Sequence, residues 1–526
     1  MGPAYRKGRI RLNKDIVTAG VDLGSGSIRM KIVQQTEQGE MTVLENVVRT
    51  VAVGRDTFST GRISMEMADE ICRVLLGFKK LMNEYKVRRR RIVATSALRE
   101  AENADAVLEL IRVRTGLTVD VLPRTEERYL TRQGALSSIP GFRKMSKDGL
   151  LYTRIGSGTT QIAAYDKGGL CFSQTTQLGT LRIHQMLSSI EKETLRYPEV
   201  LSEFITETIQ PVLHHGNQTE YEKYLISGAV CEAIYRLEEN KVRQEPYAEI
   251  DFSRFEAMYR RMLGKSAVQI EEEYGLNTET AELILPSIML IHTFGKLAGA
   301  KKLVFSFGGL LDGVLWELSA AKKNEKQRER SYEDLLAYIR VLADRFQCDR
   351  RHDDVMNDYA MQLFERLRKP RGYTDRHRML LQMAIQLHET GKYLNLTNYA
   401  DNSAMLVQVF EFSGISREEK LMVSTMIRLF ESGELTPEDP AYAEFDRNDR
   451  LVISGLSMIM RLADGLDYSR KQKFNEVGIQ ISKNHLILTA QTKQNAMLEQ
   501  WRLSGFAMQV LEILGLELEL HLKGGM

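Results

Sequence analysis

The stretch IVTAGVDLGSGSIRM, from Ile16 to Met30, decides the predicted fold. Apolar residues in its first half predict a buried strand, and apolar residues resume after the small ones. The Gly-Ser-Gly-Ser run between them predicts a tight turn, because glycine reaches backbone angles that other residues resist. The expected hairpin gathers backbone N–H groups and the hydroxyls of Ser25 and Ser27 at its tip, where a phosphate group can bind. Asp22, just before the turn, can hold a divalent cation through water.

The chain repeats this device in its second hundred residues. An apolar run at 150–155 leads into Gly156-Ser157-Gly158-Thr159-Thr160, after which apolar residues resume. The first glycines of the two turns, Gly24 and Gly156, are about 130 positions apart, which is the size of one domain. Two such turns on successive domains predict an internal duplication that holds a phosphate chain in the cleft between them.

Length, composition and charge bound the possible classes of protein. The 526 residues suffice for about three or four domains, and a hydrophobic content of 43% is that of an ordinary globular chain. No run of about 18 apolar residues occurs and the segment 1–14 is polar and basic, so we expect no membrane span, no signal peptide and a cytoplasmic location. The four cysteines lack CxxC spacing, which predicts reduced thiols. A net charge of +2 argues against a nucleic-acid-binding basic face.

Two further segments carry charged side chains suited to an anion site. The predicted strand 91–94 ends in Thr and Ser, and Arg99 follows on the first turn of a predicted helix, near the positive end of its dipole. Glu126 and Glu127 open another predicted helix. Adjacent carboxylates at a helix start are common surface residues, and the alternative is that one of them is a base that points into the cleft.

The order of these motifs carries a family resemblance. The segments DLGSGSIR, ATSALREAEN, TGLTVDV, EER, IGSGTT and LGTLRI resemble the exopolyphosphatase and guanosine pentaphosphate phosphohydrolase family, within the actin, sugar kinase and Hsp70 superfold. The late stretch FSFGGLLDG, at 305–313, resembles the last glycine motif of that family. The resemblance implies an α/β fold with two ribonuclease-H-like lobes, at 1–136 and 137–321. It also implies Mg²⁺-dependent hydrolysis of terminal phosphoanhydride bonds in inorganic polyphosphate or a guanosine polyphosphate. By the same resemblance we expect a homodimer, while hydropathy and net charge predict no membrane and no nucleic-acid partner.

The resemblance assigns roles to single residues. Glu127 matches the glutamate that activates water, a role suited to a carboxylate near a polarised water. Asp22 is the expected Mg²⁺ ligand of the cleft. Asn103 matches the helix partner of the phosphate-binding Arg99, and Gly26 stands where the family usually has Asn. The residues that match phosphate contacts are Gly24, Ser25, Gly26, Ser27, Arg29, Arg99, Arg154, Gly156, Ser157, Gly158 and Thr159.

The second turn departs from the family pattern at both of its acidic positions. Where the family has Asp-Ile-Gly-Gly-Gly-Ser-Thr-Glu, this chain has Arg154 in place of Asp and Gln161 in place of Glu. Replacing Asp removes a hard oxygen ligand for Mg²⁺, but it adds a forked donor that matches phosphate. Either Arg154 stands in for the cation while Glu127 keeps slow hydrolysis, or the chain is a regulator that binds polyphosphate or an alarmone without cutting it. Loss of metal ligands weakens transition-state stabilisation, so we expect inefficient turnover.

The second half of the chain predicts a different architecture. The charged segment 322–330 marks a boundary, and the amphipathic helical pattern beyond it resembles the all-α HD-type module of longer family members, assigned to 322–473. The tail 474–526 predicts a small α+β unit, with strands at 477–481, 486–489 and 516–522 and a helix around 498–514.

HD modules place histidines and carboxylates around one or two cations. The residues that match such a site are His352, His388, Glu389 and Asp464, with Glu389 in place of the usual Asp. One alternative is a degenerate scaffold that extends the cleft and mediates dimerisation. A third hypothesis is that the HD-like site carries the chemistry and the front lobes regulate it.

Overall fold

A computed structural model of the chain divides it into two compact units, residues 1–331 and 332–526. The model describes residues 16–36, 41–194, 196–213, 221–228, 230–239, 245–318, 322–412, 414–433, 436 and 443–523. The basic segment 1–14 therefore lies outside the described residues. Among those described, no helix is both long and apolar enough to cross a membrane.

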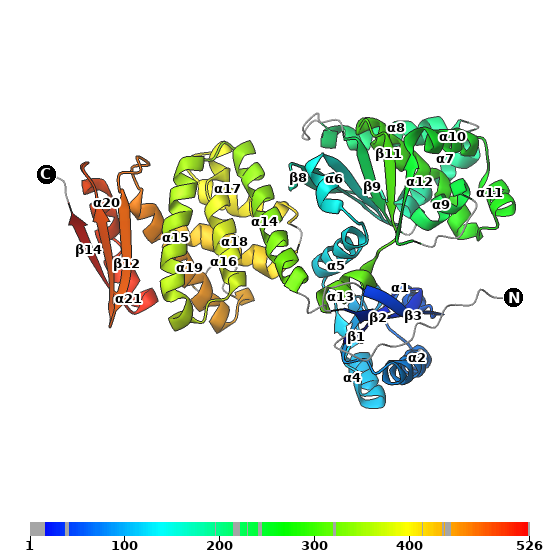
Figure 1. Ribbon diagram of the computed structural model, residues 1–526, viewed down its shortest axis with the longest axis horizontal. Helices are drawn as coiled ribbons and strands as arrows, with labels where there is room; N and C mark the ends of the chain where they lie inside the picture. The colour runs from blue at the N-terminus through cyan, green and yellow to red at the C-terminus, as the bar shows by residue number, and fades with distance from the viewer. Residues whose placement is uncertain are drawn as a thin grey trace. The chain divides into compact units, whose positions relative to one another are not determined.

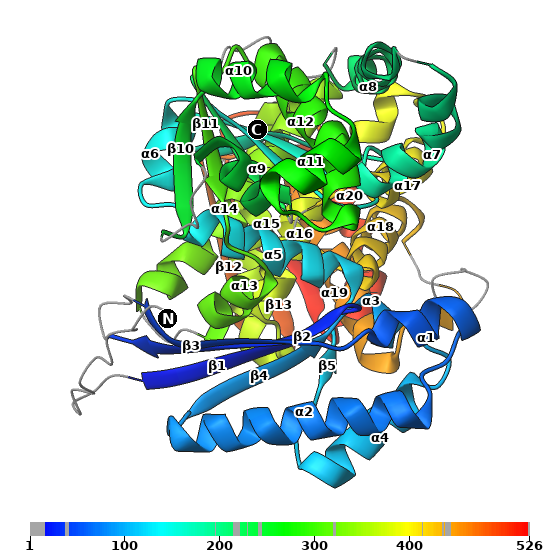
Figure 2. The same ribbon diagram turned by 90° about the vertical axis from the view of Figure 1, so that its right-hand side faces the viewer.

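The first sheet of the front unit has five strands in the order β3-β2-β1-β4-β5. They are β1 (Ile16–Leu23), β2 (Ser27–Gln35), β3 (Met41–Thr50), β4 (Arg89–Ala94) and β5 (Asp120–Val121). Strands β1, β2 and β3 are antiparallel neighbours, whereas β4 and β5 continue the sheet in parallel with β1. Helices α2 (Met65–Glu84) and α4 (Ala104–Thr115) lie along one face (Figure 2). The predicted hairpin is confirmed.

The segments between these strands include two short helices. These are α1 (Val53–Thr60) and α3 (Ser96–Arg99). Gly54 is the second residue of α1 and is buried. Ser96 is the first residue of α3, so the predicted helix bearing Arg99 begins where expected but spans only one turn.

The second sheet repeats the strand order of the first. Its order is β10-β11-β9-β6-β7-β8, so that β8-β7-β6-β9-β11 corresponds to β3-β2-β1-β4-β5 in both order and direction. The strands are β6 (Leu150–Ile155), β7 (Thr160–Asp166), β8 (Gly169–Thr176), β9 (Lys223–Ser227), β10 (Tyr247–Asp251) and β11 (Lys302–Ser306). This shared topology supports the predicted duplication of an α/β lobe. The second sheet has one additional edge strand, β10, which pairs with β11 and which the sequence analysis did not predict.

Helices pack around the second sheet (Figure 1). They are α6 (Phe142–Lys147), α7 (Thr180–Glu193), α8 (Tyr197–Leu213), α9 (Val230–Glu239), α10 (Phe252–Met262), α11 (Ala267–Tyr274) and α12 (Thr278–Leu297). Helices α7 to α12 and the sheet share one continuous core that includes fully buried Tyr224, Phe255 and Phe305. Burial of aromatic and branched side chains is the main favourable term for such a layer.

Helices α5 (Arg124–Ser137) and α13 (Leu310–Leu318) cross at very short range beside the first sheet. A methyl group on Gly134 would lie 2.0 Å from the Gly309 carbonyl oxygen, and one on Gly313 would lie 1.8 Å from that of Leu130. Only glycine allows two helix backbones to approach this closely. The glycine-rich stretch at 305–313 is therefore needed for helix packing as well as for its turn.

The second unit begins with a helical bundle. Its helices are α14 (Lys322–Arg345), α15 (Arg350–Arg371), α16 (Asp375–Leu387), the 3-10 turn η1 (Thr390–Tyr393), α17 (Tyr399–Val409), α18 (Arg417–Ser432) and α19 (Arg447–Leu466). The predicted connector 322–330 is the first part of α14, because nothing in its charged sequence breaks a helix. Residues 455–466 of α19 are all buried, so this helix forms the centre of the bundle.

The tail packs a small sheet and two helices onto this bundle. Its elements are β12 (Glu476–Ser482), β13 (His485–Gln491), α20 (Met497–Ser504), α21 (Ala507–Leu514) and β14 (Glu517–Lys523). The strand order is β12-β13-β14, as the three predicted strands require. The single predicted helix is instead two, because the chain bends at Gly505 and Phe506.

Candidate active site

The first hairpin turn closes with a hydrogen bond from the Gly24 N–H to the Ser27 carbonyl oxygen, at 3.0 Å. Beyond the turn, Asp22 and Arg29 are cross-strand partners. The Ser25 hydroxyl bonds the hydroxyl of Ser96 at 2.9 Å, which ties the tip of the turn to the start of α3. The predicted phosphate-binding residues of this turn therefore lie together on one rigid tip.

The beginning of α1 supports the same turn from another side. The Gly54 N–H donates to the Ser25 carbonyl oxygen at 2.8 Å, and the Val51 N–H donates to that of Gly26 at 3.3 Å. The Arg29 Nε donates to the Ser27 hydroxyl at 3.0 Å. The two backbone bonds use the carbonyl oxygens of Ser25 and Gly26. Packing of the neighbouring backbone therefore fixes the conformation of the turn.

Three charged side chains from separate segments meet near this hairpin. Arg99 donates to the Glu127 Oε2 and to the Leu122 carbonyl oxygen, both at 2.8 Å. Burial raises the pKa of Asp22 to about 6, with Arg29 opposing the shift and the neighbouring Glu127 adding to it. The Asp22 Oδ1 is buried and has no hydrogen-bond partner among the described residues. The site thus combines the carboxylate of Glu127, which Arg99 binds, with the carboxylate of Asp22, whose Oδ1 makes no hydrogen bond among the described residues.

The second hairpin has the same backbone as the first. Its Gly156 N–H donates to the Thr159 carbonyl oxygen at 2.9 Å, and Arg154 and Gln161 are cross-strand partners in the register that Asp22 and Arg29 occupy in the first hairpin. The two positions at which this chain departs from the family pattern therefore face each other. No carboxylate remains in that pair.

Helix α7 supports the second turn as α1 supports the first. The Thr180 N–H donates to the Gly156 carbonyl oxygen, and the Arg182 N–H donates to that of Ser157, both at 3.0 Å. A methyl group on Gly179 would lie 2.2 Å from the Ser157 carbonyl oxygen. The Leu-Gly-Thr motif before α7 thus has a structural cause, which is the close approach of its backbone to the turn.

Two polar residues in the matched motifs have structural partners. Asn103, predicted as the partner of Arg99, instead bonds both backbone groups of Ile63, each at 2.9 Å. Asp312 accepts from Lys31 at 2.6 Å and from the Gly309 N–H at 2.9 Å. The sequence analysis missed the pair of Lys31 and Asp312. The one available signal was the position of Asp312 shortly after two glycines, where a carboxylate often accepts a hydrogen bond from the first backbone N–H groups of a helix.

The predicted metal ligands of the helical bundle lie close together, but not as a metal centre. Among the described residues, no group of three or more His, Cys, Asp or Glu side chains is placed to hold a metal ion. Instead, Arg470 and Lys392 both bind the carboxylate of Glu389. Burial alone would raise the pKa of Glu389, but Arg470, His388 and Lys392 hold it far below its usual range. The prediction of a working metal site is therefore wrong for this conformation, because side-chain cations neutralise the ligand carboxylate.

The two histidines of this cluster are in different electrostatic states. His352 lies 3.0 Å from Asp467 and 3.3 Å from Asp464. Burial alone would lower the pKa of His352, but these two carboxylates outweigh it and raise the pKa to about 9. Burial lowers the pKa of His388, whose Nδ1 donates to the Ile385 carbonyl oxygen at 2.6 Å. Asp467 is a partner that the sequence analysis missed, although it follows Asp464 by only three residues.

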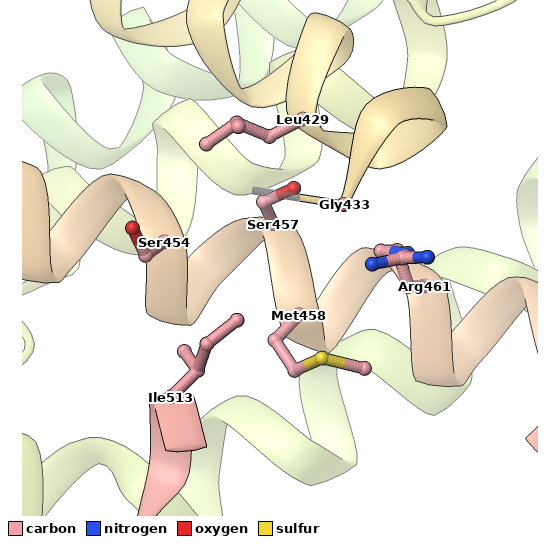
Figure 3. A pocket seen from close by; sticks show the side chains of 7 residues that line it. All are labelled: Leu429, Gly433, Ser454, Ser457, Met458, Arg461 and Ile513. Carbon is pink, nitrogen blue, oxygen red and sulfur yellow. The ribbon is translucent and has the colours of Figure 1, made fainter. Parts of the chain in front are cut away.

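A separate pocket lies between α18, α19 and the end of α21 (Figure 3). Its lining residues are Leu429, Gly433, Ser454, Ser457, Met458, Arg461 and Ile513. Arg461 donates to the Gln509 Oε1 at 2.8 Å and lies over the ring of Phe506 at 4.6 Å, while the Ser457 hydroxyl donates to the Met426 carbonyl oxygen. The polar groups of this pocket thus join α21 to α19, and we assign it no ligand.

Comparison with known proteins covers both units. Residues 32–322 match the Ppx/GppA phosphatase family, and residues 336–514 match domain III of the same phosphatases. A guanosine-5'-triphosphate,3'-diphosphate pyrophosphatase from Photobacterium profundum is 24% identical over 473 residues, which cover 90% of this chain and 91% of the relative. Its counterpart from Vibrio vulnificus is 21% identical, over 79% of this chain and 80% of the relative.

Solved structures similar to the chain span its front part. A Ppx/GppA family member from Aquifex aeolicus aligns with a TM-score of 0.49 and 21% identity, over 57% of this chain and 96% of the other. An exopolyphosphatase from Cytophaga hutchinsonii aligns with a TM-score of 0.47 and 18% identity, over 58% of this chain and 99% of the other. From the family matches across both units, we conclude that this chain belongs to the Ppx/GppA phosphatase family.

Proposed function

We propose that the chain hydrolyses the terminal phosphoanhydride bond of inorganic polyphosphate or guanosine pentaphosphate, with Glu127 as the base that activates water. The observation that carries the proposal is the contact that holds Glu127 on Arg99, at 2.8 Å, with buried Asp22 as its charged neighbour. The pyrophosphatases of Photobacterium profundum and Vibrio vulnificus support the same reaction class. The proposed substrate lies between the two hairpin turns.

The first hairpin would bind the terminal phosphate. Its exposed tip offers backbone N–H groups and the hydroxyls of Ser25 and Ser27, and Arg29 and Arg99 supply positive charge within the same site. A guanidinium matches phosphate oxygens in pairs. Arg99 would also orient Glu127, since it already bonds that carboxylate in the absence of substrate.

Asp22 fits the role of the magnesium ligand that the resemblance implies. The Asp22 Oδ1 is buried and unbonded among the described residues, and Mg²⁺ is usually held by one or two carboxylates together with substrate phosphates. Asp22 would therefore hold the cation together with the substrate phosphates. When bound, Mg²⁺ would neutralise the charge on the phosphate oxygens.

The second hairpin would bind the next phosphates through Arg154. The guanidinium of Arg154 can bind phosphate oxygens directly. A carboxylate at the same position could contact phosphate only through a bound cation. Because both acidic positions of the family pattern are lost in the Arg154 and Gln161 pair, the reaction depends on the carboxylates near the first hairpin. We therefore expect turnover slower than a full acidic set would allow.

The same pair favours a second candidate function. A chain with Arg154 and Gln161 facing each other can bind a phosphate chain without cutting it, and so act as a regulator that senses polyphosphate or an alarmone. The third hypothesis, chemistry at the HD-like cluster, loses its support, because Glu389 there is bound by Arg470 and Lys392. The homodimer and the cytoplasmic location remain predictions.

Phosphate release by the full chain tests the proposal. We would measure it with polyphosphate and with guanosine pentaphosphate, with and without Mg²⁺, for the wild type and for Glu127→Gln. The expected result is Mg²⁺-dependent release that Glu127→Gln lowers by about 10² to 10⁴-fold, with substrate binding retained. Glu126→Gln is the matched control, because Glu126 bonds Arg91 at 2.8 Å instead. Binding by both proteins with release by neither would favour the regulator.

A further inference from the structure

A groove in the second unit has strand β12 as one wall and helix α15 as the other. The two elements lie side by side in both views of the molecule (Figure 1, Figure 2). The lining of the groove includes Val355, Asp358 and Tyr359 from the helix, and Glu476, Val477 and Gly478 from the strand. Its volume is about 490 Å³, which is within the usual range of ligand sites. A groove of this size between a strand and a helix can hold a short segment of another chain.

Strand β12 forms one edge of the tail sheet, because β13 is its single partner among the described strands. Every second residue of such an edge strand directs its N–H and C=O groups away from the sheet. Natural edges are usually protected by lysine, by proline or by being very short. The seven residues of β12, EVGIQIS, include neither lysine nor proline. This edge can therefore pair with a further strand.

Gly478 leaves room for a second backbone beside this edge. A methyl group on Gly478 would come no closer than 3.8 Å to its nearest contacts, which are two atoms of Thr489. The packing of the fold thus does not require a glycine at this position. Glycine within a strand often marks a place where another backbone approaches closely, and here that place is the wall of the groove.

The charged groups that line the groove are both acidic. They are Asp358 and Glu476, and no Lys or Arg among the described residues lines it with them. Neither carboxylate forms an ion pair with another described side chain. Unpaired carboxylates at a binding surface favour a positively charged partner, while Val355, Tyr359 and Val477 offer apolar contacts. A second copy of β12 fits less well, because the only charge in its sequence is another glutamate.

We propose that this groove binds an extended segment of a partner protein, which adds to β12 as a further strand. The segment alternates basic and apolar residues, so that its basic side chains reach Asp358 and Glu476 while the others contact the apolar lining. In strand addition, main-chain hydrogen bonds give affinity and the alternate side chains give specificity. The proposal concerns only the second unit and does not depend on the phosphatase reaction proposed for the front unit.

Three labelled hexapeptides, added to the full chain and followed by fluorescence anisotropy, test the proposal. An alternating Arg-Val peptide has both features of the expected segment, whereas an alternating Glu-Val peptide reverses its charge. A third peptide repeats the Arg-Val sequence with every backbone nitrogen methylated, so it keeps the charge but donates no backbone hydrogen bond. We expect the Arg-Val peptide to bind more tightly than either of the others, by about tenfold or more.

Removal of the negative charge of the groove should weaken this binding. In the double variant Asp358→Asn with Glu476→Gln, the side chains keep their size but no longer attract arginine, so we expect a loss of affinity of about tenfold at low salt. Glu418→Gln with Glu512→Gln is the matched control, because these two carboxylates are exposed and do not line the groove. The control should bind the Arg-Val peptide as the wild type does.

A bulky side chain in the groove should block the segment without changing the charge. Gln362 is an exposed residue of α15 that also lines the groove, so Gln362→Trp should lower the affinity by about tenfold or more. Gln500→Trp, at an exposed position of α20 outside the groove, is the control for added bulk and should leave the affinity unchanged. If Gln362→Trp does not fold, the charge variants decide.

Backbone hydrogen exchange separates strand addition from ion pairing alone. A strand added to β12 supplies acceptors for its outward N–H groups, so a saturating amount of the Arg-Val peptide should slow exchange within residues 476–482 several-fold. Strand β14, at the opposite edge of the same sheet, should exchange as before and serves as the internal control.

Any of four results would overturn the proposal. The first is no saturable binding of the Arg-Val peptide below about 1 mM, and the second is equally tight binding of the methylated peptide. The third is an affinity that the double variant Asp358→Asn with Glu476→Gln leaves intact. The fourth is binding with unchanged hydrogen exchange within residues 476–482, because the peptide would then lie elsewhere.

Discussion

The two hairpins of the front unit share a backbone but differ in the side chains that face each other across it. In each, the N–H of the first glycine bonds the carbonyl oxygen three residues later, at 3.0 Å for Gly24 and 2.9 Å for Gly156. The cross-strand pair before the turn is Asp22 with Arg29 in one hairpin and Arg154 with Gln161 in the other. The two turns thus have the same geometry, but the position held by negatively charged Asp22 in the first hairpin is held by positively charged Arg154 in the second.

This difference separates what builds a phosphate-binding turn from what performs chemistry beside it. The turn depends on backbone contacts with a following helix, α1 in one lobe and α7 in the other. The chemistry depends on whether a carboxylate stands next to the turn, because a carboxylate can hold a cation or accept a proton from water and a guanidinium can do neither. The first lobe retains that capacity, and the second offers a fixed positive charge instead.

The largest expected effect is on stability, and it compares the glycines that contact the two turns. In Gly179→Ala the new methyl group would meet backbone atoms at 2.2 Å, whereas in Gly54→Ala it would meet the side chains of Phe58 and Ser25 at 2.7 and 2.8 Å. Gly179 has a φ of −97°, open to any residue, so the clash alone acts. We expect losses in the free energy of unfolding of about 3 and about 1 kcal/mol, respectively, by urea titration.

The tip glycines are the controls for that comparison. A methyl group on Gly26 or Gly158 would meet nothing within 4 Å, so Ala at either position should change the free energy of unfolding by no more than about 0.5 kcal/mol. Equal losses for Gly179→Ala and Gly158→Ala would show that the close approach of α7 does not support the turn.

The next effect concerns the carboxylate that distinguishes the first hairpin. Asp22→Asn keeps the size of the side chain but removes the charge, so Mg²⁺-dependent phosphate release should fall about 100-fold, or ~2.7 kcal/mol. Steady-state rates with polyphosphate would measure it. Asp120→Asn is the control, because Asp120 is more exposed and pairs with Arg91. Unchanged release by Asp22→Asn would remove Asp22 from the proposed site.

The guanidinium of the second hairpin should affect binding more than rate. Arg154→Gln removes a charge-assisted contact with phosphate, so affinity for polyphosphate should weaken about tenfold, or ~1.4 kcal/mol. Calorimetry at fixed salt would measure it, with exposed Arg73→Gln on α2 as the control for general charge loss. An affinity that Arg154→Gln leaves intact would mean that the second turn binds no phosphate.

The smallest effect is the pH dependence of stability from Asp22. Its pKa is about 6 in the folded chain and 3.8 in the reference state, so the folded state binds the proton more tightly. Stability from this group is complete below pH 3.8 and is lost as the pH rises through 6. Asp22→Asn should therefore be the more stable protein at pH 7, by on the order of 1 kcal/mol, and the difference should vanish toward pH 4.

An oppositely shifted carboxylate checks the sign of that prediction. Asp56 accepts hydrogen bonds from the Ser64 N–H and hydroxyl, and these bonds lower its pKa. Its ionised form therefore favours the folded state, and Asp56→Asn should be less stable than the wild type at pH 7. Unfolding curves of the wild type and both variants at pH 4.5 and 7.5 would measure this. From the lower to the higher pH, Asp22→Asn should gain stability relative to the wild type, and Asp56→Asn should lose it.

Much of the fold could be predicted because local patterns carried it. The glycine turns between apolar runs predicted both hairpins, and the alternating tail predicted β12, β13 and β14. The charged segment 322–330 was predicted to mark a boundary, and the chain does divide into its two units directly after it; the segment itself is helical, since a run of charges contains good helix formers and continues into α14. Strand β10 was missed because a short edge strand has little pattern of its own.

The candidate site was predictable in its parts but not in its pairings. Motif order brought Asp22, Arg99 and Glu127 into one hypothesis, and the structure adds that Arg99 bonds Glu127. It also shows Asn103 bonded to Ile63 instead, an outcome that no local pattern indicates. In the bundle, the histidines and carboxylates were found by spacing, but Arg470 was not, because it is 81 positions from the Glu389 that it binds.

The sequence by itself determined the two phosphate-type turns, the duplicated lobes and the loss of both acidic positions in the second turn, since glycine spacing and residue identity are local properties. The tertiary structure alone decided which charges meet. Asp22 has its raised pKa because folding buries it beside Glu127, and Glu389 is no metal ligand here because a distant loop delivers Arg470 to it. Electrostatic states depend on distance and burial, and only the folded chain sets these.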